Sequence, residues 1–583
     1  MSGEPTTWWS LFPGRREDEL AAFERHGAEA IVLSEAAGLL VLEVQWPVSG
    51  RDAMRLQVGF SYLHPIFRPN ISAPEETLER HQNPVTSGLC LLAQEGGIWR
   101  SDELVADMIA RQLQALLGVL DARALGDWDA AAAVEENFAD PVSAYFNGLG
   151  EPNSAAYFDR SLRAPSDTFG LGEAGYHHRP PQTGDGHSCV EIELNRLTPL
   201  RGTWLASKFS LPQPAEKWVS LPTRWARISP LGCKSAQDLL DRADQVASAG
   251  AAHAAQLAKW KSVGDQPLSL TVVVVRDEAE YKPGSQRDGF IFILSRRAGK
   301  KLSPSVIKAF GISEDIFDRL SLQRALRERK ALLIGCGAIG SFVALELARA
   351  GLAHLTLIDM DSVEPGNYVR WPFGRPLWGY LKAPALAAVI NQNYPWTRAA
   401  GSSATVGAAV SDPDQAATVD GNPLADFRAM IADADVVIDA SASTECQRAM
   451  SFLCKAAGTP LVIGYGTLGA AGGVVAQFGA NPRACFVCAQ EQWGNDQLPH
   501  PAVDEAGKLV PVGCNAETFT GASFDLQEIS LQIVRSAVGL VCDDAGDWDV
   551  AVLSHFKSGK RVLPSWESAR VEPQLSCCAP PTI

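Results

Sequence analysis

The sequence has little basic charge, few cysteines and no uninterrupted run of apolar residues that fits a membrane span. Its 51 Lys and Arg residues face 67 Asp and Glu residues, which gives a net charge of −16. This sign disfavours binding to a phosphate backbone, so we expect no nucleic-acid partner. Twelve cysteines spread over 583 residues argue against a secreted disulfide scaffold. We therefore expect reduced thiols and a cytoplasmic location.

Signals for export and membrane insertion are also missing. The N-terminal stretch has no basic segment followed by an apolar core, so no signal peptide is expected. The longest uncharged stretch, residues 456–482, is divided by glycines and is more typical of strand, turn and strand than of a membrane helix. We expect no membrane partner.

Length and composition indicate a multidomain α/β protein. A chain of 583 residues exceeds what one hydrophobic core organises, and its 46% of apolar residues can fill several cores. We predict an α+β domain at 1–150, a linker and α+β middle domain at 151–315, and a third domain at 316–583. Gly, Pro, His and Ser are frequent at 150–187, which predicts a linker that carries His177 and His178 as a solvated pair. The middle domain has no arrangement of residues that we can assign to chemistry.

The third region alternates predicted strands and helices. The runs ALLIG, HLTLID, DVVIDA and PLVIG are separated by predicted helices at 338–350, 380–391 and 444–457. Such alternation is typical of a doubly wound parallel sheet with helices on both faces.

A glycine turn follows the first of these strands. Gly335, Gly337 and Gly340 form a GxGxxG string between the strand and a helix, where backbone N–H groups and the helix dipole can stabilise phosphate oxygens. Asp359 ends the next strand, where its carboxylate can accept hydrogen bonds from ribose hydroxyls. A glycine-rich turn without a ligand is the alternative.

Two cations and an amide follow the ribose-binding carboxylate. Asn367, Arg370 and Lys382 suit the β and γ phosphates of a triphosphate, whereas an oxidoreductase has no need of them. With the glycine turn and Asp359, this series resembles the ThiF/MoeB and ubiquitin-activating family over about 316–540. The resemblance implies an ATP-dependent, Rossmann-like adenylating domain in which Asp359 holds ribose, Asn367 and Arg370 contact phosphates, and Lys382 neutralises the leaving pyrophosphate.

The magnesium position departs from that family's pattern. Members carry a magnesium-binding Asp three residues after a strand-ending Asp, and this chain has Ala442 there. Because Mg²⁺ prefers carboxylate and phosphate oxygens, we assign the role to Asp439, or to water and ATP alone. A strand-end cap is the other interpretation of Asp439.

Cys514 lies in a polar loop, VGCNAETFTG, before a predicted helix. An accessible thiol in such a loop can take an acyl group from an adenylate, because the thiolate is a strong nucleophile. The resemblance to adenylating enzymes that form thioesters implies this role for Cys514. An inert loop cysteine is the alternative.

A second cysteine context lies in the N-terminal domain. Residues 60–69, the His81-Gln-Asn83 string, Cys90 and Trp99 before a helix together resemble ubiquitin-conjugating enzymes over about 20–120. The resemblance implies that Cys90 carries a thioester and that the Asn83 amide stabilises the oxyanion formed when an amine attacks. Glutamine replaces the usual proline, and the spacing from Asn83 to Cys90 is one residue short. A turn-stabilising pair of His81 and Asn83 is the alternative.

Zinc is a further possibility at Cys485 and Cys488, which have CxxC spacing. Related proteins often add a second CxxC pair, which is missing here, and a structural zinc site takes four ligands. We assign no other metal site.

The domain order resembles the fused activating and conjugating proteins of bacterial CBASS anti-phage operons. That resemblance implies adenylation of a partner's C-terminal carboxylate, capture by Cys514, transfer to Cys90 and ligation to a target amine. It further implies that the partner is a cGAS-like nucleotidyltransferase, and that the adenylating domain forms a homodimer. Three alternatives remain open: a sulfur-carrier adenylating enzyme, an NAD-dependent oxidoreductase and a non-catalytic scaffold.

Overall fold

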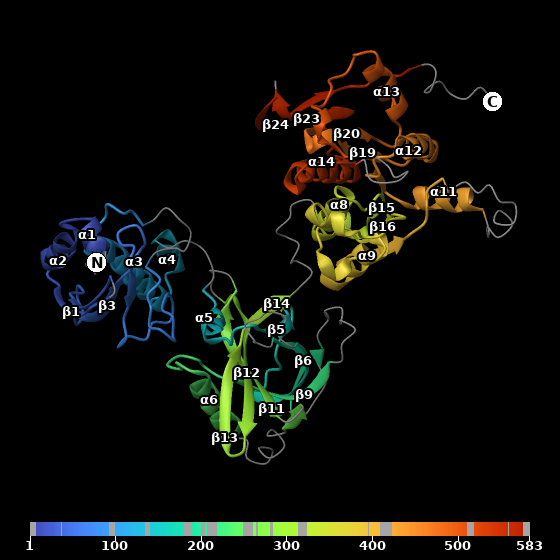
Figure 1. The fold of residues 1–583 in the computed structure, drawn as a ribbon. Coiled ribbons are helices and arrows are strands. Elements are labelled where there is room, and N and C mark those ends of the chain that lie inside the picture. Colours follow the sequence, from blue (N-terminus) through green and yellow to red (C-terminus); the bar gives the residue numbers. More distant parts are fainter. Residues whose placement is uncertain are drawn as a thin grey trace. The chain divides into compact units, whose positions relative to one another are not determined.

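The computed structural model divides into two compact units, Met1–Ser313 and Glu314–Ile583 (Figure 1). The residues that the structure describes are 7–36, 38–91, 99–134, 140–179, 189–199, 205–206, 218–248, 260–263, 266–279, 284–312, 323–394, 396–407, 422–509, 518–557 and 559–574. Each unit has hydrophobic cores of its own.

The first unit begins with a four-stranded antiparallel sheet in the order β1-β2-β3-β4. Its strands are β1 (Glu29–Ala36), β2 (Leu39–Trp46), β3 (Met54–Phe60) and β4 (Asn70–Ser72). Every second side chain of β2 and β3 is buried, as the period of a strand with one covered face requires. The helices are α1 (Trp8–Leu11), α2 (Arg15–Arg25), α3 (Val105–Ala124) and α4 (Trp128–Val134). Residues of α2 and α3 share one core with the inner face of the sheet.

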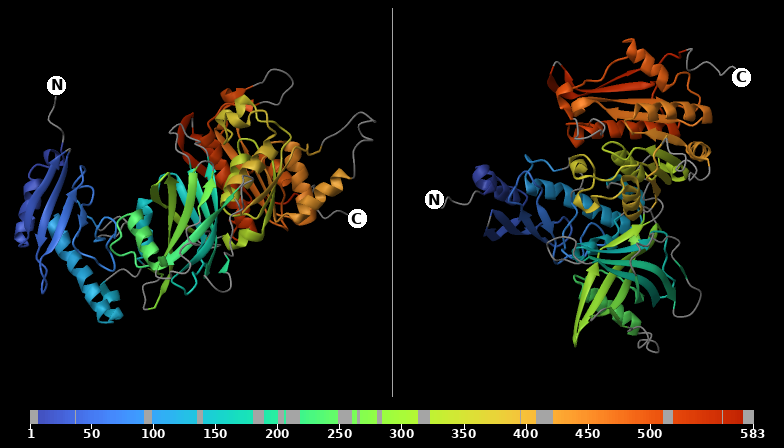
Figure 2. Two further views of the ribbon diagram at one scale, coloured as in Figure 1. Left: turned by 90° about the horizontal axis from the view of Figure 1, so that it is seen from below. Right: turned by 45° about the vertical axis from the view of Figure 1, so that its right-hand side comes forward.

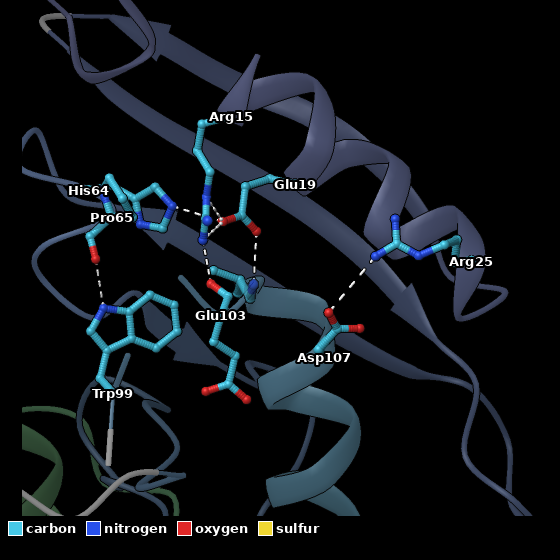
Figure 3. Close-up of polar contacts among 9 residues, drawn as sticks. Arg15, Glu19, Arg25, His64, Pro65, Trp99, Glu103 and Asp107 are labelled. Atoms are coloured by element: carbon cyan, nitrogen blue, oxygen red, sulfur yellow. Dashed lines mark hydrogen bonds and ion pairs between the residues drawn. The ribbon is translucent and has the colours of Figure 1, made fainter. Parts of the chain in front are cut away.

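A buried charged network joins α2 to α3 (Figure 3). Glu19 has no exposed surface. Its Oε1 accepts a hydrogen bond from Arg15 Nε at 2.9 Å and lies 2.9 Å from His64 Nε2. Its Oε2 accepts the N–H of Val105 at 2.8 Å, at the start of α3. Trp99 Nε1 donates to the carbonyl of Pro65 at 2.8 Å. The network fixes the loop after β3 against both helices.

A ten-stranded sheet forms the rest of the first unit, with the main order β13-β12-β11-β9-β6-β7-β5-β14. Its strands are β5 (Ser154–Asp159), β6 (Phe169–Arg179), β7 (Cys189–Pro199), β8 (Leu205–Ala206), β9 (Val219–Arg227), β10 (Lys261–Val263), β11 (Gln266–Glu278), β12 (Gln286–Ala298), β13 (Lys301–Ile307) and β14 (Ala309–Ile312). The helices α5 (Val142–Phe146) and α6 (Ala236–Ser248) share a core with β11 and β12 (Figure 2).

The linker interpretation of residues 150–187 is wrong where β5 and β6 run. Both strands lie inside the sheet, because β5 pairs with β7 and β6 pairs with β7 and β9. His177 is buried in β6 with its Nδ1 3.4 Å from Glu191 Oε2, while His178 on the opposite face is exposed. A composition rich in Gly and Pro suggested that this backbone forms no regular hydrogen bonds. Pairing with the neighbouring strands supplies them.

The second unit is built on an eight-stranded sheet in the order β17-β16-β15-β18-β19-β20-β23-β24. Its strands are β15 (Lys330–Ile334), β16 (His354–Ile358), β17 (Arg398–Ser402), β18 (Val436–Asp439), β19 (Leu461–Gly466), β20 (Gly472–Phe478), β23 (Val550–Lys557) and β24 (Lys560–Ala569). Pairing is parallel from β17 to β19 and antiparallel from β19 to β24. The predicted parallel sheet is therefore confirmed for its first five strands, and an antiparallel extension follows.

Helices cover both faces of this sheet. They are α8 (Gly340–Arg349), α9 (Lys382–Asn393), α11 (Pro423–Asp433), α12 (Thr444–Ala457), α13 (Phe486–Gly494) and α14 (Ser523–Val541). Leu333 of β15 packs in one core with α8, α9 and α14, while its neighbours Leu332 and Ile334 pack in another with α12 and α13. Alternate residues of one strand thus face two separate helical layers, which is the doubly wound arrangement.

Within the described residues, no helix combines the length and the apolar composition that crossing a bilayer requires.

Candidate functional site

The glycine turn joins β15 to α8. Gly335 has φ +86°, and a Cβ there would meet the backbone of Ala440 and Ser441 at 2.7 Å. A Cβ on Gly340 would overlap the carbonyl oxygen of Gly335, whereas a Cβ on Gly337 would meet nothing within 4 Å. Gly335 and Gly340 are therefore required by the turn itself. Gly337 faces open space, where a ligand can approach the backbone.

Asp359 lies beside this turn at the end of β16. Its Oδ2 accepts the N–H of Cys336 at 2.6 Å, and its Oδ1 accepts the N–H of Asp361 at 2.8 Å. Trp371 Nε1 donates to the carbonyl of Cys336 at 2.8 Å from the opposite side. Burial raises the pKa of the Cys336 thiol well above its ordinary value, so this cysteine is a neutral part of the core. The turn is held in shape before any ligand binds.

The amide and the two cations predicted to contact phosphates come from two short elements. Asn367 belongs to the 3₁₀ helix η4 (Pro365–Val369), and its Oδ1 accepts the N–H of Glu364 at 3.1 Å. Arg370 follows η4, and burial lowers the pKa of its guanidinium because desolvation disfavours the charged form. Lys382 begins α9, is 9% exposed, and pairs with Asp361 Oδ2 at 2.9 Å.

A cavity of about 220 Å³ brings these residues together. Four of the predicted residues line it, namely Gly337, Asn367, Arg370 and Lys382. The lining combines a bare backbone turn, two cations and an amide at the carboxyl ends of parallel strands. In an open α/β sheet this edge is where ligands bind.

Asp439 lies beside this cavity but does not line it. The side chain has no exposed surface, and its Oδ1 accepts the N–H of Ser441 at 2.9 Å and the Ser441 hydroxyl at 2.6 Å. Burial raises the pKa of the Asp439 carboxyl. The carboxylate therefore orders residues 440–442, which line the cavity; Ala442 among them has φ +58°.

Sequence reasoning missed several lining residues. Trp371, Gly466 and Leu526 line the same cavity but come from a loop, the end of β19 and α14. The Lys382–Asp361 pair was also missed, although both residues lie inside the motif region. Leu526 carries no local signal, because only the packing of α14 against the sheet brings it to the cavity.

Cys90 lies in a short bridged turn of the first unit and is exposed. Its N–H donates to the carbonyl of His81 at 2.7 Å, and its Sγ lies 3.6 Å from Tyr145 Oη. Asn83 supports the same turn, since its Oδ1 accepts the N–H groups of Val85 at 2.9 Å and Thr86 at 3.2 Å. The Asn83 amide oxygen is thus engaged in the turn, and donation from the Asn83 amide N–H group to an oxyanion stays a prediction.

The two other cysteine predictions concern the second unit. Cys514 lies outside the described residues, between β21 (Lys508–Leu509) and β22 (Thr518–Phe519). Cys485 and Cys488 are buried with their sulfurs 3.7 Å apart. In the described part of the chain, no cluster of three or more His, Cys, Asp or Glu side chains suits a metal ion, so zinc receives no support.

Residues 311–542 match the ThiF family. The glycine turn, Arg370, Lys382 and the parallel part of the sheet thus belong to a ThiF family domain. Part of the chain is 26% identical over 191 residues to molybdopterin-synthase adenylyltransferase of Escherichia coli. The match covers 33% of this chain and 69% of that protein. This homology supports an ATP-dependent adenylyltransferase.

The whole chain has a relative of the same length. The chain is 42% identical over 576 residues to protein y4oA of Sinorhizobium fredii. The match covers 98% of this chain and 97% of the relative. The chain belongs to the family of y4oA. A shorter segment of 70 residues is 34% identical to the ATP-dependent ubiquitin transferase-like protein Cap2 of Enterobacter hormaechei, and it covers 12% of each chain.

Proposed function

We propose that this protein activates the C-terminal carboxylate of a partner protein with ATP and ligates it to an amine through two thioesters. The second unit forms the acyl adenylate, Cys514 captures the acyl group, Cys90 receives it, and a target amine accepts it. The observation that carries the proposal is the cavity where Arg370, Lys382 and Asn367 line the same space as the open face of the glycine turn.

Adenylation needs positive charge where pyrophosphate leaves. A carboxylate oxygen attacks the α-phosphorus of ATP, the bond to the β-phosphate oxygen breaks, and pyrophosphate departs. Lys382 and Arg370 stabilise the charge that develops on the leaving group, and N–H groups of the turn bind phosphate oxygens. Asp359 accepts hydrogen bonds from the ribose. Lys382 exchanges its pairing with Asp361 for the phosphates when ATP binds.

Magnesium would accompany ATP, but the residues of the cavity offer the ion few ligands. None of the described residues that line the cavity is a carboxylate. Asp439 contributes through the loop that it orders, and water and the phosphates then complete the coordination of Mg²⁺. The ion would supply charge neutralisation at the phosphates.

The thioester relay rests on the resemblance of the two cysteine contexts and on the exposure of Cys90. Cap2, to which a 70-residue segment is similar, is a ubiquitin transferase-like protein, which agrees in kind with this scheme. By the same resemblance, the partner is a cGAS-like nucleotidyltransferase tail in a CBASS anti-phage operon, and the second unit forms a homodimer. A tether between activating and conjugating parts raises the effective concentration for transfer.

Two assays test the proposal. With ATP, Mg²⁺ and the cognate tail, labelled pyrophosphate exchanges into ATP; absence of exchange overturns adenylation. Non-reducing gels then follow the thioesters. Cys514→Ala abolishes both reducible adducts, Cys90→Ala leaves the first, and Cys542→Ala in the second unit serves as the matched control. Charging of Cys90 in the Cys514→Ala protein would overturn the order of the relay.

Homology to molybdopterin-synthase adenylyltransferase favours one competing function, activation of a sulfur carrier. The same Cys90→Ala variant separates the two functions. Sulfur-carrier activation continues without Cys90, whereas ligation to an amine stops.

A further inference from the structure

The residues around the Cys90 sulfur come from outside the N-terminal sheet. Tyr145 belongs to α5, and its Oη lies 3.6 Å from Cys90 Sγ. The Tyr145 hydroxyl donates to Asp140 Oδ1 at 2.8 Å, and Asp140 Oδ2 accepts the N–H of His81 at 2.7 Å. A hydroxyl has one proton to donate, so the contact with Cys90 has the thiol as donor. The three side chains form a line from sulfur to hydroxyl to carboxylate.

The ten-stranded sheet holds this segment in place. Asp277, the last residue but one of β11, is a buried carboxylate that accepts the N–H of Ser143 at 2.9 Å and the Ser143 hydroxyl at 2.5 Å. The next residue, Glu278, accepts the N–H of Asp140 at 2.9 Å and pairs with Arg80 of the Cys90 turn. Two consecutive acidic residues of the middle domain thus anchor both Asp140 and the start of α5.

We propose that Cys90, Tyr145 and Asp140 form one composite site, in which a segment anchored by β11 of the middle domain supplies a proton relay to Cys90. The inference rests on the proposed function, since it concerns the acyl transfers at Cys90. Tyr145 is then a catalytic residue because it contacts the reacting sulfur. Asp140 acts through Tyr145, and Asp277 is a positioning residue.

The relay accounts for the proton in both acyl transfers, from the donor thioester to Cys90 and from Cys90 to the amine. In the first, Cys90 Sγ attacks the thioester carbonyl carbon, a new C–S bond forms, and the donor sulfur leaves as a thiolate that takes a proton from water. The Cys90 proton moves to Tyr145 Oη while the Tyr145 proton moves to Asp140, which releases it to water. In the second, an amine forms a C–N bond, the C–S bond breaks, and Asp140 accepts the excess nitrogen proton. The relay returns that proton to the Cys90 thiolate.

The charged groups that face Cys90 act in opposite directions. Burial raises the pKa of the thiol, and the Asp140 charge raises it further. After the thiol has passed its proton to Tyr145, the hydroxyl donates to the thiolate, and this hydrogen bond and the Arg68 charge lower the pKa. On the remaining side, the ring of His81 accepts a hydrogen bond from Arg80 Nε at 3.2 Å. Removal of the Asp140 charge and removal of the Tyr145 hydroxyl therefore shift the titration of Cys90 in opposite senses.

Alkylation of Cys90 in the full-length protein measures these shifts in its titration directly. Iodoacetamide modification of the Cys90 peptide, followed by mass spectrometry as a function of pH, needs neither ATP nor a partner. We expect Asp140→Asn to move the profile to lower pH and Tyr145→Phe to move it to higher pH. Asp102→Asn, at an exposed carboxylate of the same unit, leaves the profile unchanged. Shifts in one common direction, or no shift, overturn the relay.

The transfer step provides the second readout. We expect Tyr145→Phe and Asp140→Asn each to slow transfer from Cys514 to Cys90 about 100-fold, with Cys514 charging unchanged. Asp277→Ala increases hydrogen exchange in α5 and moves the Cys90 alkylation profile to higher pH, because Tyr145 of α5 withdraws from the sulfur. Normal transfer in both relay variants overturns the inference. A wild-type protein that never charges Cys514 overturns the proposed function instead, and the alkylation profiles still decide the composite site.

Discussion

The nucleotide cavity and the Cys90 site are constructed in different ways. The predicted residues of the cavity are close in sequence, since the turn at 335–340, η4 and the start of α9 follow one another between β15 and β17. The Cys90 site depends on side chains that are far apart, because Tyr145 lies 55 residues from Cys90 and Glu278 lies 198 residues from Arg80. A site of the first kind can be identified from a motif, whereas one of the second kind needs the folded chain.

The largest effect that we predict concerns the first unit. Glu19→Ala leaves the N–H of Val105 and the Nε2 of His64 without their buried partner. Loss of one partner from a buried charged network costs about 3–5 kcal/mol in the free energy of unfolding. Hydrogen exchange of peptides from α2 and α3 in the full-length protein measures this loss.

The matched control is Glu35→Ala, which removes a surface pair with Arg16 at 2.8 Å. An exposed pair contributes about 0–1 kcal/mol. If the two variants lose equal free energy of unfolding, buried side-chain contacts between distant residues do not determine the stability of the first unit. The contrast drawn above with the cavity of the second unit would then fail.

The next effect concerns the charge of the cavity. Lys382→Ala removes a cation that lines the cavity, and under the proposed function we expect pyrophosphate exchange to fall about 100- to 1,000-fold. Lys330→Ala is the control, because Lys330 makes a comparable pair with Asp433 at 2.7 Å on the surface. A Lys382→Ala protein with the exchange rate of the control contradicts the assignment of the cavity.

The smallest effect separates the shape of the turn from its binding role. Gly340→Ala forces a Cβ against the Gly335 carbonyl, which destabilises the second unit by about 1–3 kcal/mol. Gly337→Ala meets nothing within 4 Å, so it leaves the melting temperature unchanged and weakens ATP binding. Thermal unfolding with and without ATP measures both. If Gly337→Ala binds ATP normally, the nucleotide does not approach this face of the turn.

The sequence predicted best what local pattern determines. The strand, turn and helix around Gly335 and the helix at 444–457 are where the sequence pattern placed them. Four of the predicted site residues line one cavity, and their roles stay predictions. Hydrophobic periodicity and glycine geometry act over a few residues, so they are visible in the sequence.

The remaining features depend on contacts between distant segments. The strands β5 and β6 contain the glycines and histidines that suggested a linker, and only sheet pairing explains them. The antiparallel strands β20, β23 and β24 could not be distinguished from a continued parallel sheet, because pairing direction is set by the path of the chain. Tyr145 carries no motif that relates it to Cys90.

The pairing of Arg80 with Glu278 also bears on how the newly made chain matures. While the ribosome is still translating the middle domain, the N-terminal domain can fold, but its reactive thiol lacks the hydroxyl and carboxylate that β11 holds in place. At ~5–20 residues per second, the interval between synthesis of Cys90 and of Glu278 is roughly 10–40 s. Under the proposed function, a nascent or truncated chain that ends before β11 therefore lacks the relay for acyl transfer.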